Sequence, residues 1–223
     1  MHVCLFDIDG TLLSSGGAGK AAIESALTEE FGVALRAHVP YSGRTDRAIV
    51  RDLFHFHDIE DSPAHRQRLL SGYLARLPAC LAGHQGKVLP GVAALLEQLA
   101  PRARTALGLL TGNVRAGASA KLGHFGLDHH FAFGGFGDHH LDRDDVAREA
   151  FESIREHLGR PVALECIWVI GDTPLDIRCA RAIGARVAAV ATGFHSIDEL
   201  GAEKPDLLLA DFADPSPLLD LLT

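Results

Sequence analysis

The sequence predicts an α/β protein with a doubly wound, mainly parallel, Rossmann-like sheet and a helical segment after the first strand. From residue 105 onwards, short apolar runs typical of buried strands alternate with stretches of helical periodicity. Such alternation favours a parallel sheet with helices on both faces. Between residues 21 and 81, apolar residues recur only at helical spacing, and no strand pattern interrupts them.

The first predicted strand ends in two closely spaced carboxylates. The apolar run at residues 3–6 indicates a strand buried on both faces, and Asp7 and Asp9 follow it before Gly10 and Thr11. Positions two apart on a strand lie on the same side, so both carboxylates should enter one space. There they stay ionised only beside a positive charge, for which Mg²⁺ is the natural oxygen-ligated candidate. A pair that shares a proton is the alternative.

A glycine-rich stretch follows at residues 14–20 and contains a lysine. It does not fit a phosphate-binding P-loop, because Ser14 stands where the first glycine is needed and Ala21 follows Lys20 in place of Ser or Thr. We therefore expect a flexible linker here.

The remaining elements are predicted from periodicity and turn residues. Residues 86–90 are expected to form a linker, with Pro90 in the first turn of a helix over 91–100. Strands are predicted at 105–110, 131–133, 166–170, 186–191 and 207–209, and helices at 115–122, 144–158, 175–183 and 196–200.

The composition is that of a folded globular protein, and it excludes several classes of partner. Of the 223 residues 47% are hydrophobic and 22% charged, enough for one α/β core and a small second domain. A formal net charge of −8 would repel nucleic acids and acidic membranes. The four cysteines form no C-x-x-C pair, which argues against a disulfide framework. Because the first strand begins almost at Met1 and no apolar run approaches membrane-spanning length, we expect a cytoplasmic protein.

Polar residues follow three of the predicted strands where each one ends. Asp7 and Asp9 follow the first, Thr111-Gly112-Asn113 follows the strand at 105–110, and the segment 171–176, with Asp172 and Asp176, follows the strand at 166–170. Because the carboxyl ends of parallel strands meet at one edge of a sheet, these residues should become neighbours.

These same segments carry a resemblance to a known family. Asp7-Ile8-Asp9-Gly10-Thr11 resembles the first motif of the haloacid dehalogenase-like hydrolases, in the branch that contains phosphoglycolate phosphatases. Thr111 and the later G-D-x-x-x-D pattern resemble the family's further motifs, in the same order. The resemblance implies a small all-helical cap domain, residues 14–86, inserted into a catalytic core formed by residues 1–13 and 87–223. It also implies a small phosphorylated metabolite as substrate and a monomer or homodimer.

The resemblance further implies a role for each acidic residue. Asp7 would attack phosphorus and form an aspartyl-phosphate, and Asp9 would protonate the leaving alcohol and then activate water. Mg²⁺ would be held by the Asp7 carboxylate, the Asp9 main-chain carbonyl and Asp172, with Asp176 bracing this set from behind. Thr111, Gly112 and Asn113 would bind the phosphoryl oxygens.

The family's basic residue, usually lysine, has its best match in Arg143. Arg148, one helical turn further on, is the second choice. Arginine offers a planar fork where lysine offers a mobile point charge, so the charge is kept while the hydrogen bonding must differ. The flanking acidic residues leave open a simple salt-bridged helix start.

The polar loop at residues 41–47 interrupts the helical segment. We expect residues 42–47 to close over the site, with Gly43 permitting a tight turn and Arg44 contacting the substrate beyond its phosphate. The alternative is that Thr45 or Asp46 caps the following helix and leaves Arg44 solvated.

Other functions compete with a phosphatase. A mutase of the β-phosphoglucomutase type would share every core residue, whereas a dehalogenase would lack the second carboxylate, which is present here as Asp9. A non-catalytic regulatory protein would have lost the nucleophile or a metal ligand, and none is lost. The histidine pairs His129-His130 and His139-His140 make no natural chelate, because adjacent side chains diverge.

Overall fold

The computed structural model describes residues 1–36 and 39–222, and it confirms the predicted fold class. Six parallel strands form the main sheet in the order β5-β4-β1-β6-β7-β8. Their bounds are β1 His2–Phe6, β4 Thr105–Leu110, β5 Gly134–Gly135, β6 Ile167–Gly171, β7 Arg186–Val190 and β8 Leu207–Leu209. β1 lies between β4 and β6, so the three strands that precede the predicted motifs are direct neighbours.

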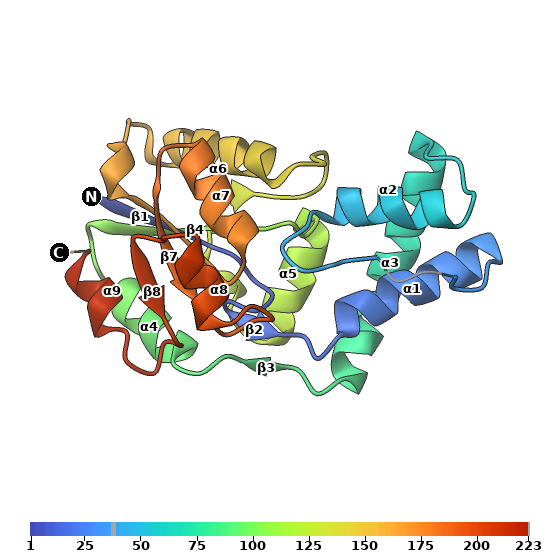
Figure 1. Ribbon diagram of the computed structural model, residues 1–223, viewed down its shortest axis with the longest axis horizontal. Coiled ribbons are helices and arrows are strands. Elements are labelled where there is room, and N and C mark those ends of the chain that lie inside the picture. The colour runs from blue at the N-terminus through green and yellow to red at the C-terminus, as the bar shows by residue number, and fades with distance from the viewer. Residues whose placement is uncertain (37–38, 223) are drawn as a thin grey trace.

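Successive residues of these strands face opposite sides of the sheet and belong to two separate cores. In β1, for example, Cys4 and Phe6 pack into one core and Val3 and Leu5 into the other. The first core is covered by α4 (Val92–Leu99), α5 (Arg115–His124) and α9 (Ser216–Asp220), and the second by α6 (Arg143–Leu158), α7 (Pro174–Ala182) and α8 (Ile197–Ala202). In Figure 1, α6 and α7 lie above the sheet and α4 and α9 below it. Burial on both faces explains why the strands are apolar except at their first residues, such as His2, Thr105 and Arg186.

Three helices form a separate body beside the sheet, at the end away from both termini (Figure 1). They are α1 (Ala18–Phe31), α2 (Asp46–Phe56) and α3 (Pro63–Gly83), and their apolar faces share a third core. A short antiparallel ribbon of β2 (Leu13–Ser14) and β3 (Lys87–Val88) joins this body to the rest. The expected junctions at 13/14 and 86/87 fall within the ribbon, and the division into cap and core stays an interpretation. Positions 37 and 38 of the expected cap lie outside the described residues.

Several predicted boundaries are wrong. No strand covers residues 131–133, and the edge strand is instead β5, the glycine pair at 134–135. Glycine is needed there because β5 lies so close to β4 that a Cβ at Gly134 would be 2.5 Å from the Leu109 carbonyl oxygen. Pro90 lies outside α4, because Gly91 with φ +78° forms the N-cap. The expected linker at 14–20 is largely structured, since α1 already begins at Ala18. Two short 3₁₀ helices, Asp128–His130 and Leu164–Cys166, precede β5 and β6.

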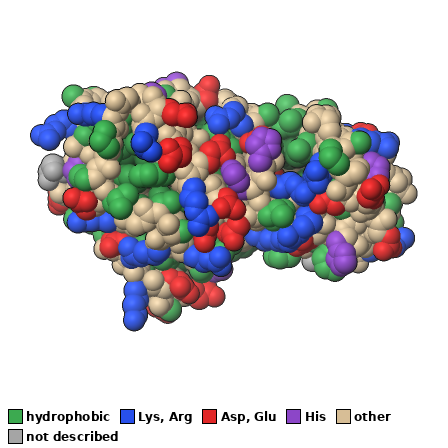
Figure 2. Space-filling model, turned by 90° about the horizontal axis from the view of Figure 1, so that it is seen from above, with side chains coloured by type: hydrophobic (Ala, Val, Ile, Leu, Met, Phe, Trp, Pro, Cys, Tyr) green, Lys and Arg blue, Asp and Glu red, His purple; other side chains and the backbone are tan. Residues whose placement is uncertain are grey.

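The surface and the cysteines agree with the composition. All four cysteines, each among the described residues, are free. Within residues 1–36 and 39–222, no helix is long and apolar enough to cross a membrane. Acidic and basic side chains are interspersed over the face shown in Figure 2.

Candidate active site

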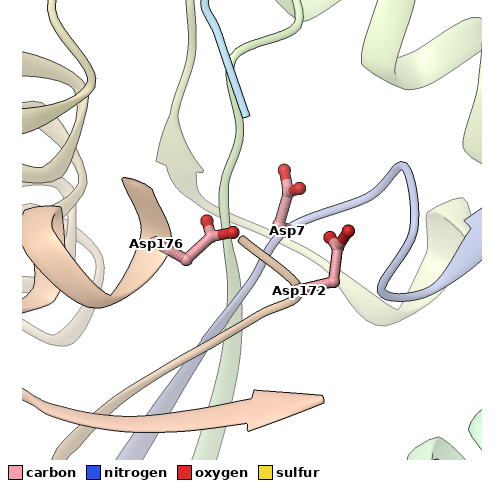
Figure 3. Close-up of side chains that lie close together, drawn as sticks. All are labelled: Asp7, Asp172 and Asp176. Atoms are coloured by element: carbon pink, nitrogen blue, oxygen red, sulfur yellow. The ribbon is translucent and has the colours of Figure 1, made fainter. Parts of the chain in front are cut away.

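Three acidic side chains meet at the carboxyl edge of the sheet. Asp7 follows β1, Asp172 follows β6, and Asp176 lies in the first turn of α7, around one small space (Figure 3). One carboxylate oxygen of each lies within 4.8 Å of the others, and all three residues are buried. The predicted meeting of these strand ends therefore occurs.

A tight turn after β1 presents the first two aspartates and then leads the chain away. The N–H groups of Thr11, Leu12 and Leu13 all donate to the Ile8 carbonyl oxygen. Gly10 has φ +88°, and a Cβ there would lie 2.3 Å from a carboxylate oxygen of Asp172, so only glycine fits. The Thr11 hydroxyl donates to Asp172 over 3.0 Å and holds that carboxylate in place.

The start of α7 fixes Asp176. Thr173 and Asp176 form a capping box, in which the Asp176 Oδ2 accepts from the Thr173 N–H over 3.0 Å and from its hydroxyl over 2.7 Å. The other oxygen, Oδ1, accepts from Arg143 over 2.5 Å. Both oxygens thus have protein donors, which suits a bracing role better than that of a main metal ligand.

Arg143 lies at the centre of this cluster, although it is the first residue of a helix. Its Nη2 is 3.0 Å from the Asp7 Oδ1 and also donates to Asp176 and to the Leu110 carbonyl oxygen. Its Nη1 donates to the Gly43 carbonyl oxygen over 3.2 Å. Arg148, the second choice from the sequence, is exposed and pairs with Asp145. The planar fork therefore reaches both carboxylates and the cap, which a lysine could not do from the same place.

The cluster carries more negative than positive charge. Burial, followed by the neighbouring carboxylates, raises the pKa of Asp172 to about 8. Burial raises the pKa of Asp7 to about 6 even though Arg143 opposes the rise. A cation would balance three buried carboxylates that share one guanidinium, and hard oxygen ligands of this kind suit Mg²⁺. The chain at Gly193 also approaches the Asp172 carboxylate closely, since a Cβ there would lie 1.7 Å from one of its oxygens.

Asp9 takes different partners from Asp7, although both line one cavity. Its Oδ2 accepts from the Lys121 Nζ over 2.5 Å and from the Asn113 Nδ2 over 2.9 Å. Burial acts against ionisation, but the Lys121 ammonium outweighs it, and the pKa of Asp9 is lowered. Its carboxylate is not part of the cluster of three, and the contact of its main-chain carbonyl with a metal stays a prediction.

Sequence reasoning missed Lys121. It lies on α5, on the face that also buries Ala118 and Leu122, and it is itself buried. The only signal in the sequence was a lysine at a position where helical periodicity calls for an apolar residue.

Thr111 and its neighbours lie where the sequence placed them. The Thr111 hydroxyl oxygen accepts from the Asn113 Nδ2 over 2.8 Å and from the Asn113 N–H over 3.3 Å. Gly112 is required by a close approach, since a Cβ there would lie 2.1 Å from the Arg44 carbonyl oxygen. Helix α5 begins at Arg115, so the N–H groups of this segment lie near its positive end.

The polar loop at residues 41–47, which leads into α2, lies directly against the segment that holds Gly112 and Val114. The Asp46 N–H donates to the Gly112 carbonyl oxygen over 2.7 Å, and its carboxylate accepts from the Val114 N–H over 2.8 Å. Gly43 has φ +68°, and a Cβ there would lie 2.7 Å from the Thr173 hydroxyl. Thr45 caps α2 by accepting from the Ala48 N–H, which is the alternative that the sequence left open.

The guanidinium of Arg44 is engaged within the cap. It pairs with Asp52 over 2.7 Å and donates to the Pro40 carbonyl oxygen over 3.1 Å. It is therefore not simply solvated, and a substrate would have to release it from Asp52. Its contact with substrate stays a prediction.

A cavity of about 440 Å³ lies between the cap and the sheet edge. Asp7, Asp9, Asp172 and Arg143 line its floor, and cap residues such as Ile23, Tyr41 and Ile49 line the other side. Lys20, Tyr73 and Phe194 also line it and were not predicted from the sequence. Enclosure by both bodies limits the site to a small molecule.

Comparisons with known proteins agree with this geometry. A family model described as haloacid dehalogenase-like hydrolase matches residues 1–184. The chain is 33% identical over 227 aligned positions to a phosphoglycolate phosphatase of Synechococcus elongatus, covering 100% of this chain and 98% of that protein. The chain belongs to the haloacid dehalogenase-like hydrolases. Within this family it is a phosphatase-type hydrolase of the phosphoglycolate phosphatase-like branch.

Solved structures share the fold. A predicted phosphoglycolate phosphatase from Haemophilus somnus superposes with a TM-score of 0.75 at 20% identity, covering 98% of both chains. CbbY of Rhodobacter sphaeroides, solved in complex with phosphate, superposes with a TM-score of 0.73 at 21% identity, covering 96% of both chains.

Proposed function

We propose that the protein is a Mg²⁺-dependent phosphatase that hydrolyses a small phosphomonoester through an aspartyl-phosphate on Asp7. The observation that supports this most is the buried cluster of Asp7, Asp172 and Asp176, with a single guanidinium beside it. Such a cluster is costly unless a cation balances its charge, and a bound cation then also attracts the oxygens of an anionic phosphoryl group. The similarity to phosphoglycolate phosphatases favours a phosphorylated two-carbon or similarly small acid as the substrate.

In the first step, a carboxylate oxygen of Asp7 forms a bond to phosphorus while the bond from phosphorus to the ester oxygen breaks. The leaving oxygen takes a proton from Asp9, which acts in its protonated form in this step although Lys121 lowers its pKa. In the second step, water attacks the phosphorus of the aspartyl-phosphate and gives its proton to Asp9. The bond from phosphorus to Asp7 breaks, which releases phosphate and restores both side chains.

The metal would be held by the carboxylates of Asp7 and Asp172 and by the main-chain carbonyl of Asp9. When bound, Mg²⁺ supplies positive charge to the phosphoryl oxygens and keeps Asp7 ionised. Asp176, whose oxygens already have donors in Thr173 and Arg143, holds this arrangement in place.

The remaining core residues bind the phosphoryl group. The Thr111 hydroxyl and the Gly112 N–H donate to phosphoryl oxygens, Asn113 holds the Thr111 oxygen, and Arg143 offsets charge at Asp7. Gly43, whose carbonyl oxygen accepts from Arg143, brings the cap loop against this group.

A screen for released phosphate tests the proposal. The purified protein, with Mg²⁺ and with a chelator, is offered phosphomonoesters that include 2-phosphoglycolate, an aryl phosphate and glucose 1-phosphate. We expect Mg²⁺-dependent phosphate release, fastest with a small anionic ester. Conversion of glucose 1-phosphate into an isomer without net phosphate release would favour the mutase instead. No turnover of any ester would favour the non-catalytic alternative.

A further inference from the structure

We propose that Lys121 is a positioning residue that orients Asp9 directly and Thr111 through Asn113. The inference rests on the proposed phosphatase function, and it assigns a role to a buried lysine that the mechanism above does not use.

Lys121 is buried, and burying an ammonium group costs free energy unless its hydrogens are bonded. Its side chain is 6% exposed, and its Nζ donates to Asp9 over 2.5 Å and to the Asn113 Oδ1 over 2.6 Å. A buried ammonium is stable only when its hydrogens find acceptors of this kind. The position therefore depends on the two polar partners rather than on packing.

Together with Asp9, the lysine determines how the Asn113 amide is turned. An ammonium group can only donate hydrogen bonds, so the amide atom that faces it must be the oxygen. The Nδ2 then points to Asp9 over 2.9 Å and to the Thr111 hydroxyl oxygen over 2.8 Å. The ionised Asp9 carboxylate can only accept and favours the same orientation from the other side, so Lys121 and Asp9 fix the amide together, and without Lys121 one of these two constraints is lost.

This orientation directs the hydrogen of Thr111. The Thr111 oxygen accepts from both the Nδ2 and the N–H of Asn113, so its lone pairs are occupied. Its own hydrogen is left to donate to another group, as binding of a phosphoryl oxygen requires. A turned amide would remove one of these donors and free the hydroxyl to rotate.

The same network fixes the orientation of Asp9. Lys121 and Asn113 both donate to Oδ2, and the Ser15 side chain also hydrogen-bonds this carboxylate. The Asp9 side chain is 38% exposed and lines the cavity, so the carboxylate is held in one orientation while it still faces the substrate space. A proton donor held in this way is presented in a defined direction to the leaving group. The ammonium is also tightly enclosed, since a Cβ at Gly19 would lie 3.2 Å from its Nζ.

The test is Lys121→Met, which keeps the length of the stem and removes the ammonium. Single-turnover rates are measured with an aryl and an alkyl phosphate, because a good leaving group needs little proton donation. We expect a loss of about 100-fold with the alkyl ester, less than about tenfold with the aryl ester, and little change in KM. Lys87→Met, on the exposed edge of the ribbon, is the matched control and should leave both rates unchanged.

A double-mutant cycle with Asp9→Asn separates orientation from stability. If Lys121 acts through Asp9, then adding Lys121→Met to the Asp9→Asn protein should lower the single-turnover rate with the alkyl ester by less than about threefold more. Equal losses on both esters, or full additivity in the cycle, would overturn the inference while leaving the phosphatase function intact. A wild-type protein without phosphatase activity would overturn both. Should Lys121→Met fail to fold, Lys121→Gln, which retains one donor, is expected to show the same preference to a smaller degree.

Discussion

The two aspartates that follow β1 are treated differently by the fold. Asp7 lies with Asp172 and Asp176, so three buried carboxylates share one guanidinium. Asp9, two residues further on, has an ammonium group of its own in Lys121. One half of the site is therefore short of positive charge, and the other half is balanced.

Under the proposed function, this difference in charge separates two chemical tasks. A site that must bind a cation and an anionic phosphoryl group in turn benefits from excess negative charge that the cation completes. A proton donor and acceptor benefits from a fixed direction and a stable hydrogen-bond network. The following predictions test this division.

The largest effect is expected at Asp7, the proposed nucleophile. Asp7→Asn should lower phosphatase activity by at least about 10³-fold with aryl and alkyl phosphates alike, because the covalent route is lost. Asp145→Asn, an exposed position on α6, is the control and should stay within about twofold. Phosphate release under saturating Mg²⁺ is the measurement, and substantial residual activity of Asp7→Asn would exclude an aspartyl-phosphate.

The next largest effect is expected at Asp9, whose charge is balanced by Lys121. Asp9→Asn should slow the single-turnover cleavage of alkyl phosphates by about 10²- to 10⁴-fold and that of aryl phosphates far less, since only the poor leaving group needs a proton. A uniform loss across leaving groups would instead indicate that Asp9 mainly holds the metal or the fold.

Without metal, removing a charge from the Asp7 cluster and removing the charge of Asp9 should change the free energy of unfolding in opposite directions. Asp172→Asn should raise the free energy of unfolding at pH 9 by on the order of 1–3 kcal/mol, because it removes a buried charge from an over-acidic cluster. Asp9→Asn should lower it, because Lys121 loses its counter-charge. Urea unfolding in a chelator measures both.

Added Mg²⁺ provides the matching test. It should stabilise the wild type by about 2.7 kcal/mol at a hundredfold excess over its Kd, and Asp172→Asn much less. Stabilisation by Mg²⁺ that survives in Asp172→Asn would place the metal elsewhere.

The smallest effect concerns the contact between cap and core. Burial raises the pKa of Asp46 from 3.8 to about 6, although Lys121 on α5 opposes the rise, and Asp9 and Asp138 add to it. Between these two values the folded protein binds more protons than the unfolded one, so this contribution to stability falls as the pH rises from 3.8 to about 6 and is constant above.

Asp46→Asn keeps an oxygen for the Val114 N–H and removes the titration. The wild type should therefore lose stability relative to this variant between pH 4 and about pH 6.5, as followed by thermal unfolding. The exposed Asp198→Asn is the control and should show no such trend. A difference between wild type and Asp46→Asn that is independent of pH would contradict the assignment.

Much of the fold could be predicted because its local signals are strong. The strand Thr105–Leu110 and the strand Leu207–Leu209 were predicted at their observed bounds, since apolar runs of that length have few other solutions. The run at 131–133 misled, because Phe133 packs as a core residue beside the edge strand rather than within it. The small glycine pair that does pair with β4 gives no apolar signal.

What the sequence by itself determined is the set of groups at the carboxyl edge of the sheet: Asp7, Asp9, Thr111 and Asp172. Each lies within three residues of the end of an apolar strand, and parallel topology brings such positions together at one edge of the sheet. Only the tertiary structure decided the partners. Lys121 reaches Asp9 across 112 positions, and Arg143 rather than Arg148 reaches Asp7. Such contacts depend on where a helix lies against the sheet and on which of its side chains points inward. Local periodicity indicates that a side chain is buried, but it does not identify the partner of a buried charged group.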